Sequence, residues 1–282
     1  MRKGQVGIVV VALIAIVAII IFLSFTSQPG GQVTFGGAAG KGLTIEQIKY
    51  KPEVVSEETV IIEAKIKNRG NFDARNVDLE ILGLTDEWKI DGETLTPGSP
   101  KRIISFPTLL GDPKFNGEEQ TAIWTLTAPI KTSPITYPFT IKLTYDYSSK
   151  YEALVRVVSP TFREKGRLID QKVTPGPISA SIKSDEWRAT AGFVNVELTI
   201  SNVGGGEVLN GVILLSNLKN LICPQEVLRF SSKDSQFEKE VKTTCRINVG
   251  SFNDFSDVEI SFNLDYRYSI KQDKSIRVKP LV

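Results

Sequence analysis

The chain has 282 residues, with 34 Lys and Arg against 32 Asp and Glu, two Cys and no His. The absence of His removes the commonest general base and the commonest metal ligand. A formal net charge of +2 argues against nucleic acid as a partner, because nucleic-acid binding rests on clustered positive charge. An apolar content of 41% excludes a wholly disordered chain.

An uncharged, strongly apolar run covers residues 6–25, directly after Arg2 and Lys3. A helix of this length can cross the hydrocarbon core of a bilayer, which is about 30 Å thick. The run is longer than the core of a cleaved secretory signal, usually about 7–15 residues. We therefore predict an N-terminal transmembrane anchor at residues 1–26. The positive charges before it predict a cytoplasmic N-terminus, with the bulk of the chain outside the cell membrane.

The segment Arg2-Lys3-Gly4-Gln5 before this run resembles the archaeal class III signal peptide of type IV pilin-like proteins. In that family a dedicated peptidase cuts between the Gly and the Gln, and the apolar helix stays on the mature subunit. The resemblance implies processing between Gly4 and Gln5 and self-association through the N-terminal helix. Family members often carry Glu at the fifth mature position, where this chain has Val9. An uncleaved anchor and a processed filament subunit both stay open.

Residues 27–42 are rich in Gly, which predicts a flexible linker. Within it, the run 36–41 has part of a phosphate-binding loop pattern. That pattern requires Gly where Phe35 stands and Ser or Thr where Gly42 stands. We therefore expect no nucleotide site there, and no cofactor elsewhere in the chain.

After the linker, apolar and polar residues alternate over several stretches, which is typical of strands with one buried face. The clearest are residues 60–67, 139–145, 194–201 and 260–266. No amphipathic helical stretch of useful length follows residue 43. Pro and Gly separate the apolar segments. The sequence therefore predicts a mainly β fold.

Landmark residues recur in the two halves of this region, which indicates an internal repeat. Ile48 precedes Asn68 by the same interval as Ile182 precedes Asn202, and Tyr145 precedes Arg156 by the same interval as Tyr266 precedes Arg277. We predict two copies of one domain, at residues 43–159 and 177–282, joined by a linker at 160–176.

Several short strands per copy, with turn signals between them, favour tandem immunoglobulin-like β-sandwiches. In each copy a strand ends in Asn-x-Gly, at Asn68 and at Asn202. We expect positive φ angles in these turns. The strand followed by Asn-x-Gly resembles CARDB-like or related adhesion-type domains, which are common on archaeal surface proteins. That resemblance implies an extracytoplasmic sandwich and no activity.

Both cysteines, Cys223 and Cys245, fall in the second copy. Outside the cell an isolated pair within one domain usually forms a disulfide, and we predict one here. Two free buried thiols are the alternative. The spacing does not fit a Cys-x-x-Cys metal clip, and no His is present to complete a zinc site. No metal site is therefore predicted at this pair.

Three further groups of residues could carry chemistry or binding. Ser216 to Lys219 fits the Ser-x-x-Lys pattern, but we expect it in a turn, without partner motifs. The acidic residues Glu57, Glu58, Glu118, Glu119, Asp254 and Asp257 are interpreted as solvated loop charges, the last two with a loop calcium site as the alternative. The tryptophans Trp88, Trp124 and Trp187 are either buried in a sandwich core or part of a carbohydrate or partner surface. No catalytic residue is predicted.

The favoured function is a non-enzymatic, single-pass, membrane-anchored cell-surface protein. Its two tandem domains would serve adhesion, interaction or spacing, with the lipid bilayer and an unidentified protein or surface polymer as partners. The alternative is a pilin-like filament subunit processed after Gly4. A second alternative is an accessory subunit of a membrane complex, or an enzyme without recognisable motifs.

Overall fold

A computed structural model describes residues 42–112, 114, 117–230, 232–233, 236–237 and 239–281. Over these residues the fold is mainly β, with sandwich-like packed sheets, which confirms the prediction of a mainly β fold. The described part contains no helix long and apolar enough to span a membrane. The predicted anchor at residues 1–26 lies outside it.

The first lobe contains a five-stranded sheet in the order β1-β3-β8-β5-β6. Its strands are β1 (Leu43–Lys49), β3 (Thr59–Asn68), β8 (Glu119–Thr127), β5 (Lys89–Ile90) and β6 (Glu93–Thr94). Facing it are β2 (Glu53–Val55), β4 (Ala74–Leu82), β7 (Ile103–Leu109) and parts of two long strands, β9 (Ile135–Val158) and β19 (Phe255–Lys279). A short 3-10 helix, η1, covers Pro100–Arg102. We call this lobe 1.

The second lobe contains a four-stranded sheet in the order β11-β12-β18-β14. Its strands are β11 (Ile178–Lys183), β12 (Phe193–Asn202), β18 (Glu240–Asn248) and β14 (Leu221–Ile222). Facing it are β10 (Arg167–Val173), β13 (Glu207–Lys219), β15 (Val227–Arg229) and the other parts of β9 and β19. A separate two-stranded sheet pairs β16 (Ser232–Lys233) with β17 (Gln236–Phe237). We call this lobe 2.

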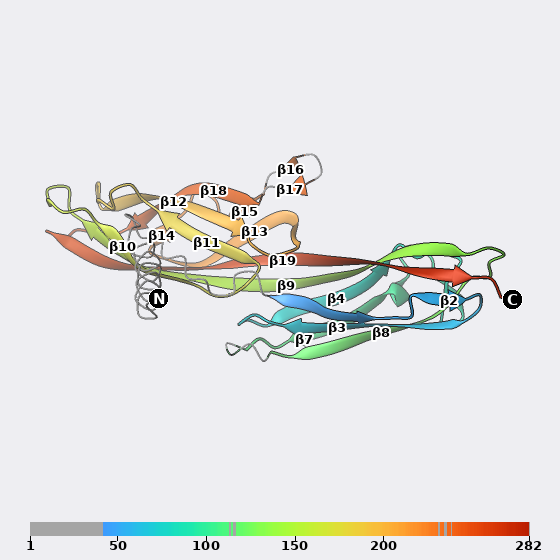
Figure 1. Cartoon of the computed structure of the whole chain (residues 1–282). Helices are drawn as coiled ribbons and strands as arrows, with labels where there is room; N and C mark the ends of the chain where they lie inside the picture. Colours follow the sequence, from blue (N-terminus) through green and yellow to red (C-terminus); the bar gives the residue numbers. More distant parts are fainter. Residues whose placement is uncertain are drawn as a thin grey trace, which may run out of the picture. The chain divides into compact units, whose positions relative to one another are not determined.

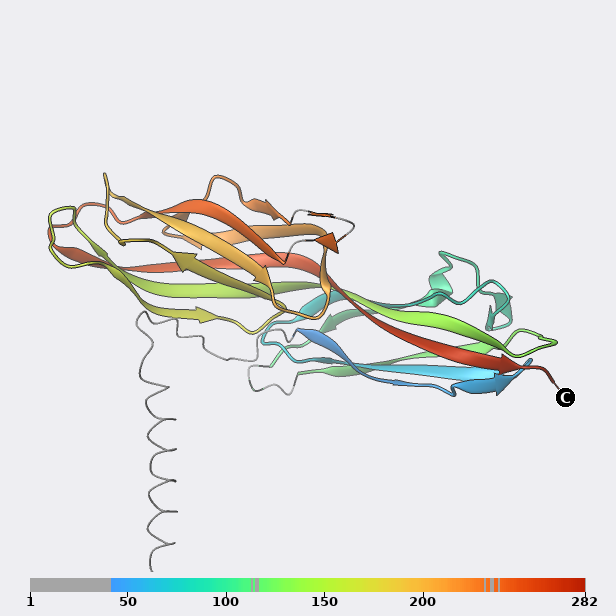
Figure 2. The same cartoon turned by 45° about the horizontal axis from the view of Figure 1, so that its top comes forward.

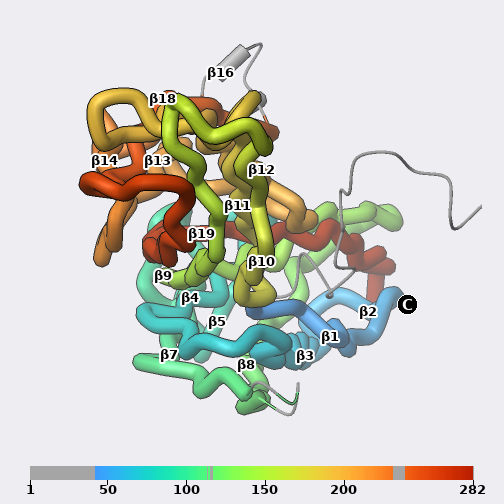
Figure 3. The backbone as a smooth tube through the Cα atoms, turned by 90° about the vertical axis from the view of Figure 1, so that its left-hand side faces the viewer, coloured from blue at the N-terminus to red at the C-terminus, as the bar shows by residue number. Residues whose placement is uncertain are grey.

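Strands β9 and β19 run through both lobes as one antiparallel pair (Figure 1). They have 24 and 25 residues, whereas strands usually have about 5–6. Pairing continues from Phe255 and Val158 at one end to Val278 and Ile135 at the other. Figures 1 and 3 place the five-stranded and four-stranded sheets on opposite sides of this pair. Because long strands twist, the buried face of this pair changes its orientation along the strands. One alternating apolar face can therefore pack against the five-stranded sheet in lobe 1 and the four-stranded sheet in lobe 2.

The domain boundaries predicted at 43–159 and 177–282 stay predictions. The structure adds that β19 extends beyond lobe 2 to pair with β2 of lobe 1, and that β9 extends into lobe 2. Strand β10 falls within the segment 160–176, which we expected to be only a linker. The two copies therefore share their longest strands.

The pairing registers of the two lobes match. Ile62 of β3 lies opposite Trp124 of β8, and Val196 of β12 lies opposite Cys245 of β18 at the corresponding point of the repeat. In both lobes the strand after the Asn-x-Gly turn has a register irregularity: at Asn76, with φ of 48°, and at Asn210, with φ of 58°. The expectation of positive φ in the Asn-x-Gly turns is wrong, because positive φ occurs at these bulges and not at the turns.

Candidate interaction surfaces

The lobes meet at a cluster of four buried tyrosines on β9 and β19, namely Tyr145, Tyr147, Tyr266 and Tyr268. In the register Tyr145 lies opposite Tyr268, and Tyr147 lies opposite Tyr266. Neighbouring ring centroids are 5.9 to 6.2 Å apart. This distance lies within the range of favourable aromatic pairs. The two copies thus contribute equally to the core of the junction.

Each Asn-x-Gly turn is held against this cluster by the same set of hydrogen bonds. The side-chain amide of Asn68 donates to Phe72 O at 2.8 Å, and that of Asn202 donates to Gly206 O at 2.9 Å. The backbone N–H of Phe72 then donates to the hydroxyl of Tyr147 at 3.3 Å. The N–H of Gly206 likewise donates to a tyrosine hydroxyl, that of Tyr268, at 3.0 Å. The Asn side chain therefore organises the turn through hydrogen bonding, a pattern typical of Asx turns.

Burial raises the pKa of the cluster tyrosines. It raises the pKa of Tyr147 to about 12, and the pKa values of Tyr145 and Tyr266 well above 10. The neutral hydroxyl is favoured because the protein interior does not solvate a phenolate. The cluster is therefore part of the core at neutral pH and carries no charge for ligand binding.

A groove of about 620 Å³ crosses the junction on the outer side of the sheet that contains β4, β9, β13 and β19. Its polar groups already bind one another. Asn76 donates to Asp146 at 2.6 Å, and Asp265 accepts hydrogen bonds from Ser148 and Ser216 at 2.5 Å each. These contacts hold the bulges and long strands in place. The named side chains of the groove therefore have partners within the protein.

The outer face of the five-stranded sheet carries exposed apolar side chains. Ile61 on β3 is 51% exposed and Ile123 on β8 is 54% exposed. The register pairs Ile61 with Thr125 and Glu63 with Ile123, so that the two isoleucines are diagonal neighbours on one face. Thr121 and Thr125 extend the surface along β8. We call this surface the β3–β8 face.

At the positions that match Ile61 and Ile123 the face of lobe 2 is polar, although Phe193 on β12 and Ile222 on β14 are exposed elsewhere on the same face. Asn195 pairs with Arg246 and Glu197 with Thr244, in the same register as the β3–β8 face. Asn195 and Thr244 thus stand where Ile61 and Ile123 stand in lobe 1. Lys242 of this face forms a 3.0 Å ion pair with Glu197. Because the two lobes have corresponding folds, the sandwich does not require isoleucine at these two positions. The β3–β8 face is therefore our candidate interaction surface.

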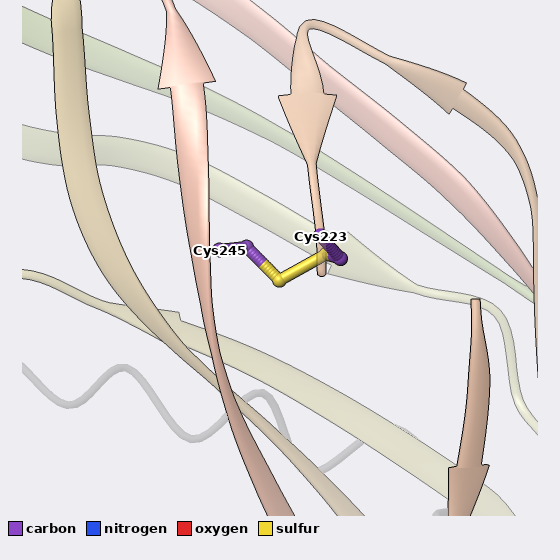
Figure 4. The surroundings of a disulfide bond; sticks show 2 residues. All are labelled: Cys223 and Cys245. Atoms are coloured by element: carbon purple, nitrogen blue, oxygen red, sulfur yellow. A yellow bond between two sulfur atoms is a disulfide. The ribbon is translucent and has the colours of Figure 1, made fainter. Parts of the chain in front are cut away.

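The predicted disulfide between Cys223 and Cys245 is present in the structure (Figure 4). It joins the residue after β14 to the middle of β18, across a sequence separation of 22. Cys245 is fully buried and stands where lobe 1 has Trp124. The disulfide thus occupies in lobe 2 the core position that a large aromatic side chain fills in lobe 1.

The three tryptophans are buried, which favours the core interpretation over a carbohydrate surface. Trp124 donates from its indole nitrogen to Arg102 O at 3.2 Å. The guanidinium of Arg102 donates to Leu84 O at 2.9 Å and to Leu95 O at 2.6 Å. The sequence does not indicate this buried Arg, because nothing in the pattern around it distinguishes it from a surface cation.

Ser216 and Lys219 lie in β13, so the expectation of a turn there is wrong. The hydroxyl of Ser216 donates to Asp265, and Lys219 pairs with Glu259 at 2.6 Å. These two side chains thus have separate partners, which does not support the Ser-x-x-Lys interpretation.

The acidic pairs are also divided among separate partners. Lys51 hydrogen-bonds to Glu58 and lowers the pKa of that carboxyl. Glu119 pairs with Lys65 at 2.6 Å, and Asp257 pairs with Arg156 at 2.8 Å. The described residues contain no group of three or more acidic or Cys side chains able to hold a metal ion. The possible processing site, Gly4 and Gln5, lies outside the described part.

No known family model matches the sequence, and a comparison with curated proteins finds no match. A functional hypothesis for this chain therefore rests on its own residues and geometry.

Proposed function

We propose that the chain is a non-enzymatic, single-pass membrane protein of the cell surface, whose two immunoglobulin-like lobes present the β3–β8 face to a protein or surface polymer. Residues 6–25 supply the anchor, and the body from residue 42 onward lies outside the cell. The observation that carries the proposal is the contrast between the exposed Ile61 and Ile123 and their polar counterparts in lobe 2.

Exposed apolar residues that gather on one face mark interaction sites more often than scattered ones. The β3–β8 face belongs to a sheet whose inner side is buried, including Ile62 and Trp124. Its threonines and isoleucines are β-branched and lose little side-chain freedom on binding. The shared strands β9 and β19 support this sheet from behind as part of one body.

The disulfide supports an extracytoplasmic location, because disulfides persist in oxidising compartments and are rare in the cytosol. The surrounding surface supports a display role, since it carries charges of both signs, some of them in exposed ion pairs such as Lys65 with Glu119, Lys242 with Glu197 and Lys271 with Glu207. Such a surface favours solubility and leaves specific binding to the apolar face.

The proposal is tested by surface labelling and by binding. A membrane-impermeant amine reagent applied to intact cells should modify lysines of the body. Beads coated with residues 42–282 should bind isolated cell envelopes, and the double variant Ile61→Asn/Ile123→Thr should bind at least about tenfold less, a loss of about 1.4 kcal/mol. The matched control is Asn195→Ala/Thr244→Ala in lobe 2, which should bind like the wild type. Equal binding by all three would contradict the assignment of this face.

A pilin-like filament subunit is the second candidate, favoured by Arg2-Lys3-Gly4-Gln5 directly before the apolar run. Cleavage after Gly4 would free the helix to pack with copies of itself in a filament. Ala12, Ala15 and Ala18 would permit close helix packing there. This candidate predicts a mature N-terminus at Gln5 and filaments released by shear that contain the chain.

A further inference from the structure

Asn210 and Gly211 form a tight turn within β13. The chain contains two Asn-Gly pairs, and of the other, Asn116-Gly117, the structure describes only the glycine. Both residues of the turn in β13 have positive φ, 58° at Asn210 and 62° at Gly211. Pairing of β13 with β19 stops at Val208 and resumes at Ile213, so the turn stands outside this ladder. Two successive residues with positive φ are typical of a type I′ turn, which favours Asn-Gly.

The repeat gives this turn a counterpart in lobe 1. Asn76 follows the Asn-x-Gly turn of lobe 1 at the same interval as Asn210 follows that of lobe 2, and its φ is also positive, at 48°. The side-chain amide of Asn76 donates to Asp146 at 2.6 Å. The next residue is the β-branched Val77 and not a glycine. In lobe 1 the amide is therefore held by a carboxylate and followed by a bulky residue.

In lobe 2 a cation occupies the position of Asp146. Arg267 stands there in the repeat, directly after the tyrosine that matches Tyr145. A guanidinium has only donors, so Arg267 cannot accept a hydrogen bond from the Asn210 amide. Arg267 instead pairs with Asp78 at 3.2 Å. Asn210 therefore lacks the contact found in lobe 1, and it is an exposed residue of the groove at the junction.

An exposed Asn followed by Gly can react within its own chain. The backbone nitrogen of Gly211 attacks Cγ of Asn210, the new N–Cγ bond closes a five-membered imide, and the Cγ–Nδ2 bond breaks. Ammonia leaves with the former amide proton of Gly211. Water then opens the imide, either at Cγ to give aspartate or at the main-chain carbonyl carbon to give isoaspartate. Glycine favours the attack because no Cβ hinders its nitrogen.

We propose that Asn210 is a deamidation site of the folded chain, whereas Asp146 and Val77 protect Asn76. Water is the only co-reactant. The product adds a negative charge to the groove, which lies where β9 and β19 pass from one lobe to the other (Figure 2). The repeat places the new carboxylate beside Arg267, as it places Asn76 beside Asp146, so that the two can form an ion pair. This site is separate from the β3–β8 face.

Peptide mapping of the full chain in detergent micelles tests the proposal. After incubation at mildly alkaline pH, which promotes loss of the Gly211 amide proton, the peptide that contains Asn210 should gain about 1 Da as a mixture of aspartate and isoaspartate. Conversion of Asn210 should be at least about tenfold faster than that of Asn76 in the same sample. The control Asn210→Gln should show no gain in this peptide, because cyclisation of Gln requires a six-membered ring. A parallel sample in urea checks that the products are detected.

An Asn210 that stays unmodified in the folded chain would overturn the proposal, and conversion in urea alone would show that the fold protects the turn. A gain of mass that persists in Asn210→Gln would assign the reaction to another residue of the peptide, such as Asn217, and would overturn it as well. Equal rates at Asn210 and Asn76 would contradict the protection assigned to Asp146 and Val77.

Discussion

Tyr268 shows how single residues support the junction between the lobes. Its hydroxyl accepts from Gly206 N at 3.0 Å and donates to Asn202 Oδ1 at 2.8 Å. The hydroxyl of Tyr145, equally buried, has one long contact of 3.4 Å with Leu43 O. The two hydroxyls therefore contribute differently to stability, although their rings pack alike.

Tyr268→Phe should lower the free energy of unfolding by about 1–2 kcal/mol, because it leaves the partly buried N–H of Gly206 without its acceptor. Tyr145→Phe, the matched control, should cost less than about 1 kcal/mol. Urea denaturation of residues 42–282 measures both. Equal losses in the two variants would show that the hydrogen bonds of Tyr268 do not stabilise the turn.

The ion pair of Glu46 and Arg69 gives a pH-dependent contribution to stability. Hydrogen bonding to the Arg69 guanidinium, at 2.9 and 2.6 Å, lowers the pKa of Glu46 from 4.5 to about 2. Because the pKa is lower in the folded state, the contribution is complete above the unfolded pKa and is lost as pH falls from about 4.5 to about 2.

Glu46→Gln should therefore reduce the free energy of unfolding at neutral pH by up to about 1 kcal/mol, as expected for a partly exposed pair. The difference from wild type should disappear near pH 2. Urea unfolding at several pH values measures it, with Glu226→Gln as a control on an exposed residue. A difference that does not change with pH would contradict the role of this pair.

At the scale of strands, sequence patterns predicted the elements better than their extent. Alternation over residues 139–145 and 260–266 identified parts of β9 and β19. Their continuation through both lobes could not be predicted, because alternation shows that one face is buried but not which sheet covers it. Strand β10 was missed because its apolar residues are few and irregularly spaced.

The candidate face was visible in the sequence only in part. Ile61 falls on the polar side of the alternation in residues 60–67, which marks an apolar residue directed toward solvent. Its neighbour Ile123 could not be assigned without the register between β3 and β8. Cross-strand register depends on tertiary packing, so the patch required the structure.

The disulfide links the short strand β14 to β18. Only two residues of β14 pair with β18. Closing this loop should stabilise the folded state by about 3 kcal/mol in the chain-entropy model. Reduction of residues 42–282 should lower the free energy of unfolding by about that amount, as measured by urea denaturation with and without reductant. The same reductant should leave Cys223→Ala/Cys245→Ala unchanged, and a loss in that variant would assign the effect to another cause.

At the scale of the whole molecule, the shared strands predict that the lobes unfold together. Trp88 and Trp124 lie in lobe 1, whereas Trp187 lies next to lobe 2 strands. In Trp187→Phe the tryptophan fluorescence reports lobe 1, and in Trp88→Phe/Trp124→Phe it reports lobe 2. Within each variant, fluorescence and far-ultraviolet circular dichroism should give one midpoint.

A fragment of residues 177–282 provides the complementary test. It lacks β9 and β10, which pair in lobe 2, and leaves the last part of β19 without partners. We expect it to melt without a cooperative transition, whereas residues 42–282 should show one. A cooperative transition in the fragment, or separate midpoints in the tryptophan variants, would mean that the copies are independent units.

The membrane-anchored display of this body is tested most directly by determining the N-terminus and location of the chain in native membranes. The proposed function predicts a chain that starts at Met1, stays in the membrane fraction and is digested from the outside of intact cells down to its anchor. A chain that starts at Gln5 in sheared filaments, or one found dissolved in the cytosol with Cys223 and Cys245 reduced, would contradict it.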